Sequence, residues 1–234
     1  MLVFSLESSQ SEGRPQKKVP YPVWEGSLLP VRIEPLNKQK KRVFLDDGTI
    51  LHLYNGEIRR FQLSVDTVLE GTAYTELMQC LCKRARSRAL HLLQAADRPT
   101  TEILEKLRQG GYPDAVAEDA LAYLNYYGYT DDTRYIQNYI ESHQKTQSRA
   151  QIRQTLCRKG LDSAQIDALL PEEHDAEIDL LMRLTEKYCR GRDLSDEKEY
   201  RRLVARLMRR GFGYVAIKDA IGCFAENIAE IEDL

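Results

Sequence analysis

The chain has 234 residues and a mass of 27.0 kDa, and its 34 basic and 36 acidic side chains leave a formal net charge of -2. A mean hydropathy of -0.51, with 30% charged residues, is typical of a helical protein in water, and no apolar run approaches the roughly 20 residues that a membrane span needs. A pI near 6.1 counts against a dedicated DNA-binding protein, which usually carries a basic excess.

The first 24 residues (1–24) predict a flexible tail. Residues 1–6 lack the basic start and the long apolar stretch of a signal peptide, so we expect a cytoplasmic protein with no membrane partner. Residues 7–20 are rich in serine, lysine, glycine and proline and show no apolar periodicity, which favours disorder. The five cysteines of the chain include no C-x-x-C pair, so we expect reduced thiols rather than a disulfide framework or a zinc site.

Residues 25–66 predict a small antiparallel β segment. The apolar runs that fit strands are 29–34, 43–45 and 50–54. The Asp47-Gly48 step separates the second run from the third and is a strong hairpin signal. A second turn candidate, Asn55-Gly56, leads into further apolar residues up to Leu63. Because three short strands are near the lower limit of independent stability, the sheet should pack on a neighbouring helix.

A basic turn separates the first two runs of the β segment. It consists of Lys38, Lys40, Lys41 and Arg42. These side chains could contact phosphate, although a solvated loop is the favoured interpretation.

A glycine-centred segment occurs three times in the rest of the chain. Its copies are Leu107-Arg-Gln-Gly-Gly-Tyr112, Leu156-Cys-Arg-Lys-Gly-Leu161 and Leu207-Met-Arg-Arg-Gly-Phe212. Each copy is typical of a helix end, in which glycine takes the left-handed C′ position and the next apolar residue folds back on the helix. Gly111, Gly160 and Gly211 lie 49 and 51 residues apart, and a period of this size indicates a repeated supersecondary unit.

The apolar residues around each glycine predict helices on both sides of it. They recur eight and four positions before the glycine, and one and ten positions after it. We therefore expect a mainly α fold of tandem three-helix repeats, with nine helices in an elongated, monomeric array after the β segment. The expected repeats span residues 67–129, 130–172 and 173–234.

Two basic windows fall on the middle helices of the second and third repeats. Residues 142–161 contain five basic side chains and no acidic one, and residues 200–218 contain six and none. Residues 162–179 then contain seven acidic side chains and no lysine or arginine. Two basic faces one period apart suit an extended acidic partner such as a nucleic acid or a helical filament, and ordinary solvated faces are the alternative interpretation. The candidate contact residues are Arg149, Arg153, Arg158, Lys159, Arg202, Arg206, Arg209 and Arg210.

Tyrosines cluster around the junction of the first two repeats. They are Tyr126, Tyr127, Tyr129, Tyr135 and Tyr139. We expect their rings to pack the junction with the hydroxyls at the surface. A base-stacking or partner-anchoring patch is the alternative, and it would require several exposed rings on one face.

The sequence shows no catalytic constellation, and we expect a protein that is not an enzyme and holds no cofactor or metal. The four histidines have no partner at metal or triad spacing. Neither a G-x-S-x-G elbow nor a glycine-rich phosphate loop occurs. With a repeat architecture, this absence favours binding over chemistry.

In its repeats the chain resembles the RecX family, whose members regulate the RecA recombinase. The segments that carry the resemblance, in order, are Leu107 to Tyr112 with the helix to Leu124, Gly128-Tyr-Thr-Asp-Asp132 with Tyr135 and Tyr139, Ile152 to Leu161, and Arg209-Arg-Gly-Phe212. Together they cover roughly residues 85–225. The N-terminal sheet is similar to that of longer members of the family.

The resemblance implies a crescent of repeats that lies along the groove of the RecA filament and spans neighbouring protomers. It further implies that binding lowers recombinase and ATPase activity or promotes filament loss, in recombination, DNA repair and the SOS response. The expected partners are the RecA filament and also single- and double-stranded DNA, contacted through the eight basic residues named above. Two alternatives are a helix-turn-helix-type DNA-binding protein that acts independently of RecA, and a helical scaffold for another protein.

Overall fold

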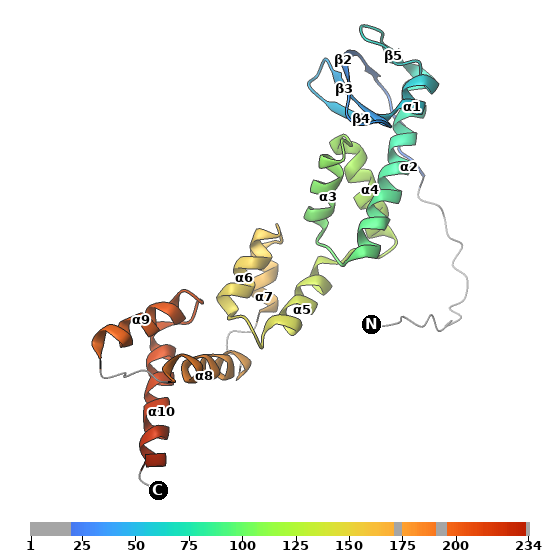
Figure 1. The fold of residues 1–234 in the computed structure, drawn as a ribbon. Coiled ribbons are helices and arrows are strands. Elements are labelled where there is room, and N and C mark those ends of the chain that lie inside the picture. The colour runs from blue at the N-terminus through green and yellow to red at the C-terminus, as the bar shows by residue number, and fades with distance from the viewer. Residues whose placement is uncertain (1–19, 171–174, 191–195, 233–234) are drawn as a thin grey trace, which may run out of the picture.

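The computed structural model describes residues 20–170, 175–190 and 196–232, so most of the predicted tail lies outside the described residues. Figure 1 shows an elongated molecule in which a small sheet is followed by helices laid out in chain order. The strands are β1 (Ser27–Leu28), β2 (Pro30–Pro35), β3 (Lys40–Leu45), β4 (Ile50–Tyr54) and β5 (Leu69–Glu70). The helices are α1 (Asn55–Arg60), α2 (Gly71–Ala95), α3 (Thr100–Gln109), α4 (Asp114–Tyr126), α5 (Asp132–His143), α6 (Arg149–Arg158), α7 (Ser163–Leu169), α8 (Asp175–Cys189), α9 (Glu197–Met208) and α10 (Tyr214–Glu232). The predicted fold class, a mainly α array preceded by a small antiparallel sheet, is confirmed.

The three-stranded sheet has the order β2-β3-β4, and both strand pairs are antiparallel. The predicted hairpin is present, because the Leu45 amide donates to the Thr49 carbonyl at 2.9 Å and Gly48 takes a φ of 84°, which suits glycine. Val43 and Leu53 are completely buried on one face of the sheet. That face packs into the core formed with the helices.

The chain after β4 forms a helix, so the predicted turn at Asn55-Gly56 is wrong. The carboxylate of Glu57, in the first turn of α1, accepts a hydrogen bond from the Tyr54 amide at 2.7 Å. Such a bond caps the start of a helix and competes with the turn that the Asn-Gly step favours. Arg84 of α2 also binds Glu57 and holds α1 against the longest helix.

The sheet and the first repeat share one hydrophobic core. Leu77, Leu81 and Ala85 of α2 are completely buried and pack with residues of the sheet, α3 and α4. A buried ion pair joins α2 to α4, because Arg86 Nη2 lies 2.7 Å from Asp119 Oδ1 and both side chains are less than a tenth exposed. The short strands are therefore supported by helices, as their length requires.

The second and third repeats each have a core of their own. Ile136 and Leu156 are completely buried at the centre of the second repeat. Leu207 and Ile217 are likewise completely buried in the core of the third repeat. Because each core is drawn from one repeat, the contacts at the joints between successive repeats determine how the array is held together.

The repeat glycines form these joints. Gly160 has a φ of 79°, and a Cβ atom there would lie 2.9 Å from Thr101 Oγ1 of the first repeat. Gly211 has a φ of 88°, and a Cβ atom there would lie 2.7 Å from the Cβ of Ala150 in the second repeat. Thr101 and Ala150 are each the second residue of a middle helix. Each glycine turn thus seats on the start of the middle helix of the repeat before it.

A hydroxyl group strengthens both of these joints. The Thr101 hydroxyl donates to the Lys159 carbonyl at 2.7 Å. The Ser148 hydroxyl donates to the Arg210 carbonyl in the same way. Lys159 and Arg210 are the residues just before the two glycines, so the hydroxyls satisfy carbonyls that a helix end leaves without an intrahelical partner.

A carboxylate from the following repeat completes each joint. Asp132 at the start of α5 accepts from the Thr100 amide at 2.9 Å. Glu177 in the first turn of α8 accepts from the Arg149 amide, also at 2.9 Å. Thr100 and Arg149 are the first residues of α3 and α6, whose amides also lack an intrahelical partner. Successive repeats therefore cap each other's helices.

The first glycine makes an equivalent contact with the sheet. The His52 amide of β4 donates to the Gly111 carbonyl at 3.2 Å. A Cβ atom at Gly111, whose φ is 75°, would overlap the His52 ring. The sheet thus occupies the place that a preceding repeat would have.

Candidate partner-binding surfaces

Arg149 and Arg153 lie one turn apart at the start of α6, where Ser148 caps the helix. Arg153 forms a two-point ion pair with Asp167 of α7, with N to O distances of 2.6 and 2.8 Å. Their hydrogen bond is the main cause that raises the pKa of Arg153 and lowers the pKa of Asp167. Both side chains are 45% exposed, so solvent screens this pair.

Arg149 is only partly exposed and lacks a full set of acceptors. Its Nη2 donates to the Leu170 carbonyl at 3.3 Å, whereas its Nε is buried and has no hydrogen-bond partner among the described residues. The side chain lines a groove of about 600 Å³ that also contacts Leu181 of α8 and Phe212 of the third glycine segment. This groove between the second and third repeats therefore contains an incompletely paired cation.

Two more candidate residues lie at the end of α6. Arg158 is exposed, and within the described chain its Nη2 donates only to Thr155 Oγ1, at 3.3 Å. Lys159 Nζ lies 3.7 Å from Glu102 Oε2 of α3 and 5.8 Å from the centre of the Tyr135 ring. Lys159 thus contributes to the contact between the first two repeats, while Arg158 points its charge to solvent.

The candidate residues in and just after α9 also differ in whether another side chain of the protein contacts their charge. Arg202 forms an ion pair with Glu199 one turn before it. Arg206 lies 3.9 Å above the Tyr188 ring of α8, which is a cation–π contact. Arg209 follows the last residue of α9 and is exposed. Its charge is available at the surface of the third repeat.

Four of the eight candidates occupy equivalent positions in two repeats. Arg158 and Lys159 directly precede Gly160, and Arg209 and Arg210 directly precede Gly211. Among the described residues, Arg158, Arg209 and Arg210 form no ion pair. Cations at helix C-termini also interact favourably with the helix macrodipole, so these side chains contribute to helix stability whether or not a partner is bound.

The acidic band of the sequence folds back onto the basic windows. Asp167 pairs with Arg153, and Glu177 accepts the Arg149 amide. The basic windows are consequently less positive in space than in sequence, which the spacing along the chain did not indicate.

The tyrosines near the first junction form two groups. At the end of α4 the Tyr127 ring contacts those of Tyr126 and Tyr129, with ring centres 5.1 and 5.9 Å away. Tyr126 is 64% exposed and Tyr129 is 47% exposed. Tyr135 and Tyr139 stack along α5 with ring centres 6.4 Å apart and are partly buried. The region thus combines exposed rings on the first repeat with partly buried rings on the second.

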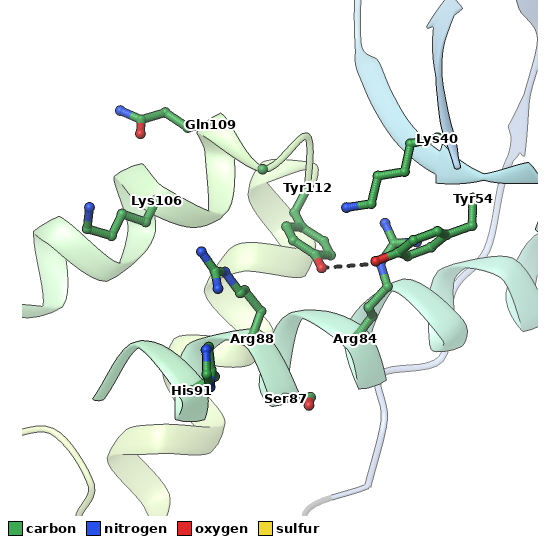
Figure 2. A pocket seen from close by; sticks show the side chains of 10 residues that line it. Lys40, Tyr54, Arg84, Ser87, Arg88, His91, Lys106, Gln109 and Tyr112 are labelled. Atoms are coloured by element: carbon green, nitrogen blue, oxygen red, sulfur yellow. Dashed lines mark hydrogen bonds between the residues drawn. The ribbon is translucent and has the colours of Figure 1, made fainter. Parts of the chain in front are cut away.

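Sequence reasoning missed a further concentration of basic side chains at the other end of the molecule. Figure 2 shows it in a groove between the sheet, α2 and α3. The predicted basic turn is wrong for three of its four residues, because strand β3 begins at Lys40 and pairs with β4 from there. Lys40 lies in this groove with Arg84 and Arg88 of α2. The signal in the sequence was the spacing of basic residues along α2, which the search for repeats did not consider.

The described part of the chain contains no candidate metal site and no candidate membrane-spanning helix. Within residues 20–170, 175–190 and 196–232, no group of three His, Cys, Asp or Glu side chains is placed to hold a metal ion. Nor does any described helix combine the length and the apolar character that crossing a bilayer requires.

Three family models match the chain in order. The first three-helix domain of RecX matches residues 85–124, the second matches 131–170 and the third matches 175–221. These ranges contain the three glycine segments, the whole helix before each of them and all or part of the helix after it. The matches therefore follow the same repeat that the glycine spacing defines.

Named relatives and solved structures agree with these models. A regulatory protein RecX of Vibrio campbellii is 30% identical over 138 residues, which cover 58% of this chain and 89% of the relative. One of Clostridium tetani is 27% identical over 202 residues, which cover 83% of this chain and 92% of the relative. A crystal structure of regulatory protein RecX superposes with a TM-score of 0.57 at 24% identity, covering 82% of this chain and 99% of that one. RecX from Lactobacillus salivarius superposes with a TM-score of 0.56 at 21% identity, covering 62% and 96%. The chain belongs to the RecX family of regulatory proteins.

Proposed function

We propose that this protein binds the RecA–DNA filament and inhibits the recombinase and ATPase activities of RecA. It acts in the cytoplasm through binding and catalyses no reaction itself. The observation that carries the proposal is the recurrence of arginines just before Gly160 and Gly211, at equivalent positions of two successive repeats, that form no ion pair with any described residue. A filament repeats its surface at regular intervals, so charges that recur along an array can contact it more than once.

The elongated shape supports a polymeric partner. The repeats follow one another from α2 to α10 without folding back into one core, as Figure 1 shows. Such an array presents a long surface on which several weak contacts add. RecA filaments carry acidic protein surface and DNA phosphate, and both attract arginine.

The residues that carry the binding fall into two classes. Arg158, Arg209 and Arg210 have no ion pair within the described chain and can contact a partner directly. Arg153 and Arg202 are exposed but must exchange their partners Asp167 and Glu199 for the filament. The remaining candidates, Arg149, Lys159 and Arg206, have contacts between elements that a partner would have to replace.

The first experiment is RecA-catalysed ATP hydrolysis on single-stranded DNA, with and without this protein. The expected result is a lower rate. Replacing Arg158, Arg209 and Arg210 by alanine should weaken filament binding about tenfold, a change of about 1.4 kcal/mol, and should reduce its salt dependence. An unchanged ATPase rate at saturating protein would reject the inhibitory function.

A matched control separates these arginines from net charge. Lys83, Arg134 and Lys187 are exposed and lie on other helices, and replacing all three by alanine changes the charge by the same amount. This control variant should inhibit RecA as the unchanged protein does. Equal losses in both triple variants would reject the assigned residues while leaving filament binding in place.

The competing function is DNA binding by a helix-turn-helix-type protein that acts without RecA. Binding to RecA-coated and to bare DNA at physiological salt distinguishes the two. Preference for the coated filament supports the regulator, and equal or tighter binding to bare duplex supports the competing function. The acidic pI of 6.1 favours the regulator.

A further inference from the structure

The groove between the N-terminal sheet and the first repeat is lined by basic side chains and by none that is acidic. It has a volume of about 600 Å³, and Figure 2 shows Lys40, Arg84, Arg88 and Lys106 around it. These side chains come from β3 and from the consecutive helices α2 and α3, so the groove joins a strand of the sheet to helices that begin 26 or more residues after it. The groove lies at the opposite end of the array from α9.

Arg84 is the fixed member of this group. Its guanidinium binds the Glu57 carboxylate, donates to the His52 carbonyl at 2.6 Å and donates to the Tyr112 hydroxyl at 3.2 Å. Only 17% of its side chain is exposed. Arg84 therefore shapes the floor of the groove, and the other cations determine the charge that a ligand meets.

The remaining cations are less engaged. Arg88 is exposed and forms no ion pair or hydrogen bond with any described residue. Lys40 Nζ lies 4.5 Å from the centre of the Tyr54 ring, which orients the amine without neutralising it. Lys106 Nζ lies 3.9 Å from Glu102 Oε1, at the limit of an ion pair. Lys40 and Arg88 consequently give the groove a positive charge for which the described residues provide no ion pair.

The pKa of the neighbouring His52 reflects the positive charge of the groove. Burial is the first cause that lowers the pKa of His52, and the positive charges of Lys40, Arg42 and Arg84 lower it further. Like charges disfavour the protonated imidazole. The positive potential that disfavours a protonated imidazole would attract an anion in the groove.

The arrangement of the cations suits an extended ligand. Arg84, Arg88 and His91 lie on one face of α2 at steps of about one turn, and the seven residue steps from Arg84 to His91 span about 10.5 Å. Lys106 of α3 also lines the groove. A compact anion would contact only part of this row, whereas a chain of phosphates would follow it.

We infer that this groove binds the phosphodiester backbone of a single nucleic-acid strand. Lys40, Arg88 and Lys106 contact the phosphates, and Arg84 holds the sheet and α2 in place beneath them. The inference goes beyond the proposed function, because it concerns bare nucleic acid and residues outside α6 and α9. It requires no contact with RecA.

The test measures binding of a fluorescent 30-residue oligothymidylate to the full chain as a function of salt, without RecA. The double variant Lys40→Ala with Arg88→Ala should weaken binding at least tenfold. It should also reduce the slope of log affinity against log salt by about 1.4, because each single-strand phosphate contact contributes about 0.7. Circular dichroism and urea unfolding confirm that the variant is folded.

The matched control is Lys38→Ala with Lys83→Ala, which removes two exposed charges near the same strand and on the same helix but outside the groove. Its affinity should stay within twofold of the unchanged protein. Unchanged binding by the groove variant, or an equal loss in the control, would overturn the inference.

Two further arms identify the ligand. Inorganic tripolyphosphate should compete with the oligonucleotide only at far higher phosphate concentration, and equal competition would show that the groove takes compact phosphates instead. The Arg158, Arg209 and Arg210 triple variant should retain the groove-dependent affinity for the bare strand. Loss of RecA-filament binding by the groove variant with no change toward bare strand would assign the groove to protein and overturn the inference.

Discussion

The joint between the second and third repeats gives the sharpest prediction about the fold. Gly211 has a φ of 88° and seats against Ala150 and Ser148 of the preceding repeat. In Gly211→Ala the new Cβ atom would lie 2.7 Å from Ala150 Cβ and 2.8 Å from Ser148 Oγ. Two costs therefore coincide at one position, namely backbone strain in the left-handed region and crowding between repeats.

The two costs can be separated within this chain. Gly128 also ends a helix with a positive φ of 68°, but a Cβ atom there meets nothing within 4 Å. Gly128→Ala should lose only the backbone term, about 1–2 kcal/mol. Gly211→Ala adds crowding in a packed joint, about 1–3 kcal/mol, so its total cost is about 2–5 kcal/mol. Gly213→Ala has neither a positive φ nor a close neighbour and should change stability little.

Urea unfolding of the three variants measures these differences, and small-angle scattering reports whether the joint opens. The expected order of stability loss is Gly211→Ala, then Gly128→Ala, then Gly213→Ala. The radius of gyration should change only in the first. If Gly211→Ala and Gly128→Ala lose equal stability and have the same radius of gyration, Gly211 serves only to end its helix. Crowding against the preceding repeat would then contribute nothing to stability.

Two other predictions concern the N-terminal unit. Asp119→Ala leaves the buried Arg86 charge without its carboxylate and should lower the free energy of unfolding by about 3 kcal/mol, whereas Asp114→Ala, at an exposed position, should change it little. The pKa of His52 is lowered by burial first and then by Lys40, so below about pH 6.5 the unfolded chain takes up a proton that the folded chain resists. Stability should therefore fall more steeply from pH 7 to pH 5 in the unchanged protein than in His52→Gln, and parallel curves would remove His52 as the cause.

The helix ends and the hairpin could be predicted because the groups that determine them are close in sequence. The amide of Phe212 donates to the Leu207 carbonyl at 3.4 Å, which is the helix-end bond that the third glycine segment predicts. Phe212 is also buried, as expected of the apolar residue after the glycine. The turn at Asn55 failed although it too is local, because the Glu57 carboxylate favoured a helix start over the turn.

The joints and the basic groove could not be predicted because their partners are distant in sequence. Ser148 meets the carbonyl of Arg210, 62 residues away, and the Asp132 carboxylate caps a helix that begins at Thr100. The same limit applies to charge, since the pairing of Arg153 with Asp167 follows from the packing of α6 on α7.

Lys159 and Arg210 take part in the joints between repeats and also belong to the candidate contact residues, which links the stability of the joints to the proposed function. The carbonyls of Lys159 and Arg210 accept the hydroxyls of the preceding repeat, so the backbone that carries these cations is fixed at the joint. The packing at the joints therefore determines the distance between successive basic helix ends. Binding at several points depends on this distance as well as on charge. Gly211→Ala should accordingly weaken filament binding although it changes no charge. Gly128→Ala, whose methyl group meets no neighbour, should weaken it less, and equal effects of the two would separate the spacing of the charges from the seating of the joint.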